Sequence, residues 1–258
     1  MNALPLVSCV MPTYGRPDYV NESVAMFLAQ DYPNKELIIL NDCAGQNFTG
    51  EFPNVRVINE AIRYPTIGDK CNRSISMASG SVIAVWDDDD VYLPWRLSFC
   101  VSEMCRLKTP FYRPADYWAY WGDGRLHHNH SVLGWPGHAY VTFTKSLWQA
   151  VHGYPAMNVG QDAGFFARIH KQLREPFIKY ELAKVDRFGI LRGTSQYKHV
   201  SIEGGLHPLD TTPGNYRITP TSIRDPILRA AHDRLVAARC TNSCVPKHAP
   251  SMTRKSGF

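Results

Sequence analysis

Four short apolar runs, separated by amphipathic segments, constrain the fold of this chain more than any other feature. The runs cover residues 6–11, 36–40, 55–58 and 82–86, and each is short enough to be one buried strand. Segments with a helical apolar period follow at 18–28, 67–78 and 94–107. Continuous apolar strands joined through helices are typical of a parallel sheet covered on both faces. We therefore predict an α/β fold with a mostly parallel sheet flanked by helices.

The second half of the chain has a less regular pattern. Residues 109–137 are rich in Trp, Tyr, His, Gly and Pro, which indicates a long excursion or a small subsheet. Beyond it we expect strands at 141–143 and 177–182, helices at 146–152, from Asp162 onwards and at 225–239, and a loop over 204–224. These elements predict one domain over residues 1–235 and a basic, flexible tail over 236–258.

Composition narrows the class of protein. With 258 residues, 44% of them hydrophobic, the chain is long enough to bury one substantial core. No run approaches the ~18 apolar residues of a membrane span and no export signal is found, so we expect no integral membrane segment. The seven scattered cysteines suit reduced thiols in a cytoplasmic protein. The net charge of +5 is mild and would suit a nucleotide diphosphate or a nucleic acid.

A run of four aspartates, Asp87 to Asp90, directly follows the fourth apolar run. Adjacent carboxylates repel one another, so a cation or several hydrogen-bond donors must lie beside them. Carboxylate oxygens are typical ligands of Mg²⁺ and Mn²⁺. The alternative is a solvated acidic turn that caps the next helix. Because ligands of parallel α/β sheets bind at this end of the strands, we favour a metal site.

Other polar residues follow the remaining strands, at what should be the same edge of the sheet. Thr13 and Tyr14 come after the first run, and Asp42 comes after the second. Asp42 is placed to accept a hydrogen bond from a base or ribose, or to form an Asx turn near Gly45. Asp162 lies at the start of a predicted helix, where it acts either as the helix cap or as a carboxylate base. These positions predict a ligand-binding site at the carboxyl edge.

Several segments, taken in order, resemble glycosyltransferase family 2. They correspond to the family's opening strand and loop, its nucleotide-binding Asp, its helix with a basic residue and Asn, its Asp-X-Asp motif, and its Gly-Gly-Phe and Glu-Asp segments. The resemblance extends over roughly residues 6–169 and is carried by residues 7–16, 37–42, 68–72, 82–90, 152–155 and 160–162.

The resemblance implies a GT-A fold and an inverting glycosyltransferase that uses a nucleotide-diphosphate sugar with Mn²⁺ or Mg²⁺. It implies that Asp162 is the general base. Asp87 and Asp89 would be the Asp-X-Asp pair, with Asp89 as the direct metal ligand. His199 would be a further ligand, although an ordinary surface histidine is the alternative. The residues expected to bind the nucleotide sugar are Pro12, Thr13, Tyr14, Arg16, Asp42, Lys70, Asn72, Asp87 and Asp88.

The acceptor side is less defined. Trp118, Trp121 and Trp135 either form a stacking platform for the acceptor or pack a subsheet. Gln161 stands where the family usually has Glu, which is expected to change contacts with the acceptor. We expect a saccharide or another small molecule as acceptor. DNA with hydroxymethylated bases is the alternative, motivated by the basic balance and the aromatic excursion.

Two other classes of protein fit less well. A nucleotidyltransferase can share a similar sheet, but it usually opens with a Gly-rich loop that contains Arg, unlike residues 12–17. A non-catalytic carbohydrate- or nucleic-acid-binding protein on a glycosyltransferase scaffold would have no need to retain both the aspartate run and Asp162.

Overall fold

The four apolar runs form adjacent strands at the centre of the molecule. A computed structural model describes residues 3–114, 116–120, 124–130, 138–173, 189–192 and 209–241. Its central sheet has six strands in the order β4-β2-β1-β5-β10-β7. The first four pair in parallel, whereas β10 is antiparallel to both of its neighbours. The strands are β1 (Val7–Thr13), β2 (Lys35–Asn41), β4 (Val55–Asn59), β5 (Val82–Val85), β7 (Phe111–Tyr112) and β10 (Thr142–Thr144).

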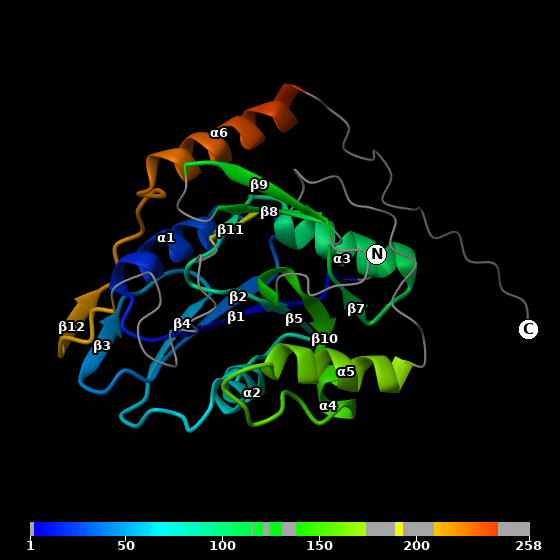
Figure 1. The fold of residues 1–258 in the computed structure, drawn as a ribbon, viewed down its shortest axis with the longest axis horizontal. Coiled ribbons are helices and arrows are strands. Elements are labelled where there is room, and N and C mark those ends of the chain that lie inside the picture. Colours follow the sequence, from blue (N-terminus) through cyan, green and yellow to red (C-terminus); the bar gives the residue numbers. More distant parts are fainter. Residues whose placement is uncertain are drawn as a thin grey trace, which may run out of the picture.

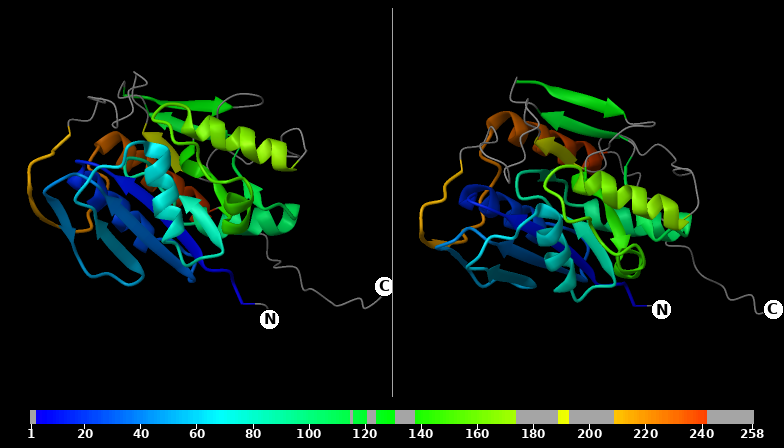
Figure 2. Two further views of the ribbon diagram at one scale, coloured as in Figure 1. Left: turned by 90° about the horizontal axis from the view of Figure 1, so that it is seen from below. Right: turned by 60° about the horizontal axis from the view of Figure 1, so that its bottom comes forward.

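Helices cover both faces of this sheet, which confirms the predicted α/β architecture (Figure 1). On one face lie α1 (Pro17–Leu28), α3 (Arg96–Leu107) and α6 (Pro226–Thr241). On the other face lie α2 (Ile67–Ser76), α4 (Lys145–Ala150) and α5 (Gln161–Leu173). Both views in Figure 2 place α2 and α5 side by side, and these two helices are in contact. The helices thus begin within a few residues of the predicted positions.

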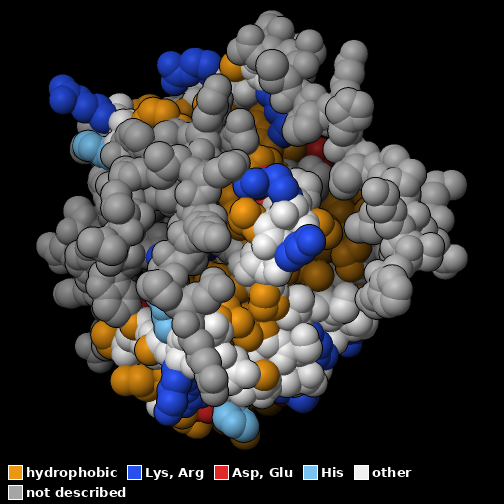
Figure 3. Space-filling view, turned by 90° about the vertical axis from the view of Figure 1, so that its right-hand side faces the viewer, with side chains coloured by type: hydrophobic (Ala, Val, Ile, Leu, Met, Phe, Trp, Pro, Cys, Tyr) orange, Lys and Arg blue, Asp and Glu red, His pale blue; other side chains and the backbone are white. Residues whose placement is uncertain are grey.

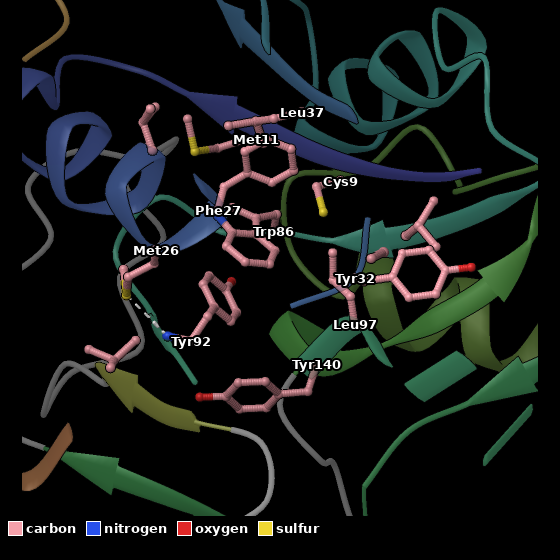
Figure 4. Close-up of a cluster of buried hydrophobic side chains, with 14 of the residues drawn as sticks. Cys9, Met11, Met26, Phe27, Tyr32, Leu37, Trp86, Tyr92, Leu97 and Tyr140 are labelled. Atoms are coloured by element: carbon pink, nitrogen blue, oxygen red, sulfur yellow. Dashed lines mark hydrogen bonds between the residues drawn. The ribbon is translucent and has the colours of Figure 1, made fainter. Parts of the chain in front are cut away.

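The alternation of side chains along β1 explains why both faces need a helical layer. Cys9 and Met11 belong to a hydrophobic cluster with Phe27 of α1, while Val10 belongs to a second cluster with Phe165 of α5. Figure 4 shows part of the first cluster. All of these side chains are almost fully buried, so β1 contributes apolar surface to the core on each face of the sheet.

The first cluster also contains the residues that flank the aspartate run. Trp86, immediately before the run, packs on Tyr92 with their ring centroids 4.0 Å apart, and its Nε1 donates to Ser23 Oγ at 2.8 Å. Tyr92, just after the run, donates its hydroxyl to the carbonyl of Asp87 at 3.1 Å. The guanidinium of Arg96 lies 4.9 Å from the Trp86 ring and 4.6 Å from the Tyr92 ring. Buried aromatic packing therefore holds both ends of the acidic turn.

The predicted excursion contributes β7 to the central sheet, and its residues 116–120 and 126–130 form part of a smaller sheet, in agreement with the expected subsheet. This sheet has four strands in the order β6-β11-β8-β9 and lies under α6 in Figure 1. Trp118 is half-buried there and packs against the first hydrophobic cluster. The strands are β6 (Val91–Tyr92), β8 (Asp116–Tyr120), β9 (Leu126–His130) and β11 (Gly189–Arg192), and a short 3₁₀ turn, His138–Tyr140, precedes β10.

The expectation of a loop over 204–224 was wrong for part of that segment. Gly214–Arg217 forms β12, which pairs in parallel with β3 (Gln46–Thr49). Neither strand is an apolar run, so each depends on the other for its hydrogen bonds and for the packing of Phe48 on Tyr216. Gly45 precedes β3 with a φ of +76°, and a Cβ there would lie 3.1 Å from Pro213. Such a pairing between distant segments has no local signal.

Pro155 fixes the position of α5 relative to α2. A Cβ on Gly68 of α2 would lie 1.9 Å from the carbonyl oxygen of Pro155, and one on Gly164 of α5 would lie 2.6 Å from its ring. Both helices therefore approach Pro155 where they have no side chain. The start of α5, and with it Asp162, is set by this contact.

The remaining expectations concern the C-terminal segment, membrane-spanning helices and the cysteines. The predicted last helix is confirmed as α6, which continues past residue 235, so the predicted domain boundary falls within a helix. The expected strand at 177–182 and the tail beyond residue 241 lie outside the described residues. Among the described helices, none has the length and apolar character needed to cross a membrane. The thiols of Cys9, Cys43, Cys71, Cys100 and Cys105 are free.

Candidate functional site

The aspartate run and the loop after β1 meet at the carboxyl edge of the sheet. Strands β1 and β5 are parallel neighbours, so the residues that follow them lie side by side. Thr13 Oγ1 donates to Asp88 Oδ2 at 2.6 Å, and Arg16 Nη1 donates to Asp88 Oδ1 at 2.8 Å. The same nitrogen of Arg16 also contacts Asp89 Oδ2 at 2.5 Å. The structure thus brings together four of the residues that the sequence assigned to the donor and metal sites.

The carboxylates of this cluster carry more negative charge than their neighbours balance. Burial, followed by the charges of Asp89 and Asp88, raises the pKa of Asp87 to about 7, although Arg96 and Arg16 oppose this shift. Burial also raises the pKa of Asp88 against the effect of Arg16. Burial opposes the charged form of Arg16, but Asp89 and Asp88 outweigh it and raise the Arg16 pKa. The cluster is therefore poised to receive positive charge.

A divalent cation fits this arrangement. Asp87, Asp88 and Asp89 follow one another in the sequence, their mutual repulsion raises the Asp87 pKa, and the guanidinium of Arg16 contacts only Asp88 and Asp89. Asp87 and Asp89 are only partly buried, and no described residue forms a hydrogen bond or an ion pair with the Asp87 carboxylate. No group of three or more His, Cys, Asp or Glu side chains within the described ranges could hold a metal ion by itself. Further ligands must come from a substrate, water or residues outside those ranges, where His199 lies.

A buried ion pair forms the base of the neighbouring loop. Lys70 Nζ contacts Asp42 Oδ1 at 2.5 Å and donates to the carbonyl of Thr13 at 2.6 Å. The second oxygen of Asp42 accepts from the backbone N–H of Tyr64 at 2.9 Å. Burial lowers the pKa of Lys70, although Asp42 opposes this shift. Asp42 and Lys70 therefore tie together the loops after β1, β2 and β4.

Tyr14 lies above this pair with two cations near its ring. The guanidinium carbon of Arg63 is 4.2 Å from the ring centroid, and Lys70 Nζ is 5.9 Å from it. Tyr14 and Lys70 were expected at this site from the sequence, whereas Arg63 was not. No motif marks Arg63, because its position depends on how the loop after β4 folds back over the loop after β1. Pro12, which was also expected at the nucleotide site, lies within β1.

Asn72 makes its contacts with the protein itself. Its Nδ2 donates to the carbonyl of Tyr154 at 2.9 Å, and its Oδ1 accepts from Tyr154 N–H at 2.8 Å and from Trp148 Nε1 at 3.0 Å. These three bonds fix the turn at Gly153, which has a φ of +64°. The structure thus links the helix of Lys70 to the segment that leads into α5.

Gln161 and Asp162 begin α5 close to the aspartate run. Asp162 Oδ1 accepts from Ala163 N–H at 2.8 Å. Burial raises the pKa of Cys71 to about 12, and both Asp87 and Asp162 add to that rise. Burial, followed by Cys71 and the same two carboxylates, raises the pKa of the Tyr154 hydroxyl, which lies 2.6 Å from His138 Nε2. Because both charges act on the same two groups, the start of α5 lies near the end of β5.

The Gln161 amide is unusual because it is buried without a partner for its oxygen. Only 4% of the residue is exposed. Its Oε1 atom accepts no hydrogen bond from any residue in the described part of the chain. Of the other acceptor-side residues, Trp118 packs in the small sheet, and Trp121 and Trp135 lie outside the described residues.

Comparison with known proteins agrees with this geometry. The profile described as Glycosyl transferase family 2 matches residues 8–174 of the chain, which contain the aspartate run, the Lys70 helix and Asp162. The chain belongs to glycosyltransferase family 2. This family 2 member is 32% identical over 112 residues to the glycosyl transferase WcaA of Escherichia coli (strain K12). It is 27% identical over 134 residues to the Escherichia coli UDP-Glc:alpha-D-GlcNAc-diphosphoundecaprenol beta-1,3-glucosyltransferase WfgD.

The fold is also that of solved glycosyltransferase structures. The crystal structure of S. aureus TarS 1-349 in complex with UDP-GlcNAc superposes with a TM-score of 0.53 at 14% sequence identity, over 93% of this chain and 68% of that one. This similarity confirms the GT-A fold. The matches to WcaA and WfgD cover 41% and 50% of this family 2 chain, and 40% and 49% of those relatives.

The buried Lys70–Asp42 pair can be tested by a double-mutant cycle. Lys70→Met should destabilise the protein by about 3–5 kcal/mol, because it leaves the Asp42 carboxylate buried without its cation. The double variant Lys70→Met/Asp42→Asn should be more stable than Lys70→Met alone, as measured by urea unfolding. Arg106→Met, at the more exposed Arg106–Glu103 pair, is the control and should cost less than about 1 kcal/mol. Equal losses in the single and double variants would contradict this account.

Proposed function

We propose that this protein is an inverting glycosyltransferase that moves a sugar from a nucleotide diphosphate to an acceptor hydroxyl. One observation carries the proposal. The Asp87 carboxylate of the aspartate run and the Asp162 carboxylate act on the same buried groups, Cys71 and Tyr154. A charge-neutralising centre for the departing diphosphate therefore lies near a carboxylate that can take a proton.

The donor nucleotide would bind over the loops after β1 and β2. Tyr14 offers an aromatic face, and Thr13 and Arg16 are held in place by Asp88 before any ligand arrives. Lys70 keeps its charged group beneath Tyr14, bound to Asp42 and to the Thr13 carbonyl. In this account Asp42 acts mainly by positioning Lys70 and the Tyr64 backbone. The donors are fixed in advance, so little reorganisation is needed when the nucleotide binds.

Asp87 and Asp89 would hold Mg²⁺ or Mn²⁺ together with oxygens of the donor diphosphate. When bound, such an ion supplies positive charge that stabilises the leaving diphosphate. Asp89 would exchange its contact with Arg16 for this role, while Asp88 keeps Arg16 and Thr13. Arg16 then remains beside the cluster as a second positive charge for the phosphates.

Asp162 would remove the proton from the acceptor hydroxyl as the new glycosidic bond forms. The Ala163 N–H bond fixes one carboxylate oxygen, and no described residue bonds to the other. That second oxygen is the one available to the acceptor. An attack on the face opposite the leaving diphosphate gives inversion, which needs one carboxylate base and no covalent intermediate.

A saccharide or another small molecule is the acceptor that we favour. The name of the relative WfgD gives alpha-D-GlcNAc-diphosphoundecaprenol, a sugar linked to a lipid diphosphate, as its acceptor. On the face drawn in Figure 3, the described Lys and Arg side chains are scattered among hydrophobic and uncharged ones instead of forming one stripe. A nucleic acid would call for a more continuous basic track. A screen of nucleotide sugars and acceptors, including DNA with hydroxymethylated pyrimidines and read by mass spectrometry, tests this choice.

Asp89→Ala should remove the metal-dependent part of donor binding. At a nucleotide diphosphate concentration of about 100 times Kd, the wild type should gain about 2.7 kcal/mol of stability when Mn²⁺ is present. The variant should show the same small shift with and without Mn²⁺ in thermal unfolding with UDP, GDP, CDP and TDP. Asp233→Ala, an exposed position on α6, is the control. A full metal-dependent shift in Asp89→Ala would exclude this residue as a ligand.

Asp162→Asn should separate binding from transfer. The amide keeps the shape of the side chain and can still accept from Ala163 N–H, but it cannot take a proton. We expect kcat to fall about 10²- to 10⁴-fold, while the Kd of the donor stays within about twofold. Single-turnover transfer measured beside isothermal titration checks both quantities. Retention of full turnover would show that another group is the base.

Gln161→Met should stabilise the free protein and impair use of the acceptor. Replacing the unpartnered buried amide by an apolar side chain of similar length should add about 1 kcal/mol of stability. If Oε1 accepts from a sugar hydroxyl, the acceptor KM should rise about tenfold. Gln30→Met is the matched control, because Gln30 is equally buried but bonds to Leu93 and Leu97. That variant should lose stability and keep its KM. An unchanged KM in Gln161→Met would remove Gln161 from the site.

A further inference from the structure

Arg63 lies over the proposed nucleoside site without being part of any recognised motif. Its guanidinium carbon is 4.2 Å from the centroid of the Tyr14 ring, which is the distance of a direct cation–π contact. The next residue, Tyr64, donates its backbone N–H to Asp42 Oδ2 at 2.9 Å. The loop that carries Arg63 is therefore fixed to the loop after β2, and Arg63 projects from there to the loop after β1.

The charge of Arg63 also reaches the residue after Asp42. Burial and Asp42 raise the pKa of the Cys43 thiol, while Lys70, a hydrogen bond with the Gly15 backbone and Arg63 oppose that rise. Cys43 and Gly15 belong to the two loops between which a nucleoside would enter. Arg63 thus lies near both loops and contacts the Tyr14 ring, and Lys70 lies near the same ring.

The two cations near Tyr14 differ in their exposure. Lys70 is 4% exposed and is held by Asp42 and the Thr13 carbonyl, so it can contact a ligand only where it already lies. Arg63 is exposed and lies on a loop. A guanidinium is flat and stacks on heteroaromatic rings as readily as on tyrosine. Its contact with Tyr14 can therefore be exchanged for one with a ligand ring.

We propose that Arg63 is a nucleobase-binding residue, whose guanidinium leaves the Tyr14 ring and covers the base of the donor nucleotide. The inference rests on the proposed function, since it assumes that a nucleotide sugar binds at Tyr14. The base is held between an aromatic ring below and a planar cation above. Because stacking on a guanidinium needs no particular edge of the base, Arg63 adds affinity for purine and pyrimidine nucleotides alike.

The proposal is tested by binding of nucleosides and of nucleoside diphosphates with Mn²⁺, measured by isothermal titration or ligand-detected NMR. The variants are Arg63→Met, which removes both the charge and the flat guanidinium group, and Arg63→Lys, which keeps only the charge. If Arg63 stacks on the base, both variants should raise the Kd of the nucleoside and the Kd of its diphosphate by the same factor, about 3- to 30-fold. Arg73→Met, at a half-exposed arginine of α2 that pairs with Glu60, should bind as the wild type does.

The other outcomes overturn the inference in distinguishable ways. If Arg63→Lys binds normally and Arg63→Met loses only diphosphate binding, with an effect that added salt removes, Arg63 contacts phosphate and the base assignment is wrong. If both variants bind every ligand as tightly as the wild type, Arg63 has no role in donor binding. If the wild type itself binds no nucleotide, the proposed function fails as well. Thermal unfolding of the ligand-free variants, which should match the wild type, shows that a change in binding does not reflect a change in folding.

Discussion

One guanidinium placed between repelling carboxylates organises the donor end of this protein. Arg16 contacts Asp88 and Asp89 through a single nitrogen, and so joins the loop after β1 to the loop after β5. Thr13, from the same loop, donates to Asp88 and offers its carbonyl to Lys70, which in turn binds Asp42. Each contact brings a further loop into the site. Because Arg16 compensates only part of the carboxylate charge, the same arrangement leaves room for a divalent cation.

The packing beneath the site explains how such a cluster of charges is tolerated. Trp86 and Tyr92 stack at the two ends of the acidic turn, and Arg96 lies over both rings. The turn is held by apolar contacts that do not depend on the protonation of the aspartates. Preorganisation of this kind is costly for the free protein and useful to an enzyme, because the charges are already in place when the ligand arrives.

The site also combines buried and exposed groups. Lys70, Asp42 and the Asp88–Arg16 pair are buried and mutually bonded, whereas Arg63 is exposed over Tyr14. Gln161, with its unpartnered amide oxygen, bears an energetic cost that a purely structural residue would not. In the proposed function, the buried groups would hold the diphosphate and the exposed Arg63 would contact the base.

The sequence by itself determined the parallel sheet, its helices and the residues at strand ends, because apolar periodicity and the aspartate run are local signals. It therefore placed Thr13, Asp42, Asp87–Asp89 and Asp162 at one edge of the fold. Only the tertiary structure decided what those residues contact: that Asp42 binds Lys70, that Asn72 bonds to Trp148 and Tyr154, and that Arg63 covers Tyr14. The pairing of β3 with β12 was invisible for the same reason, since the paired residues Gln46 and Gly214 are 168 positions apart. Contacts between distant segments depend on the whole packed chain, and no local pattern records them.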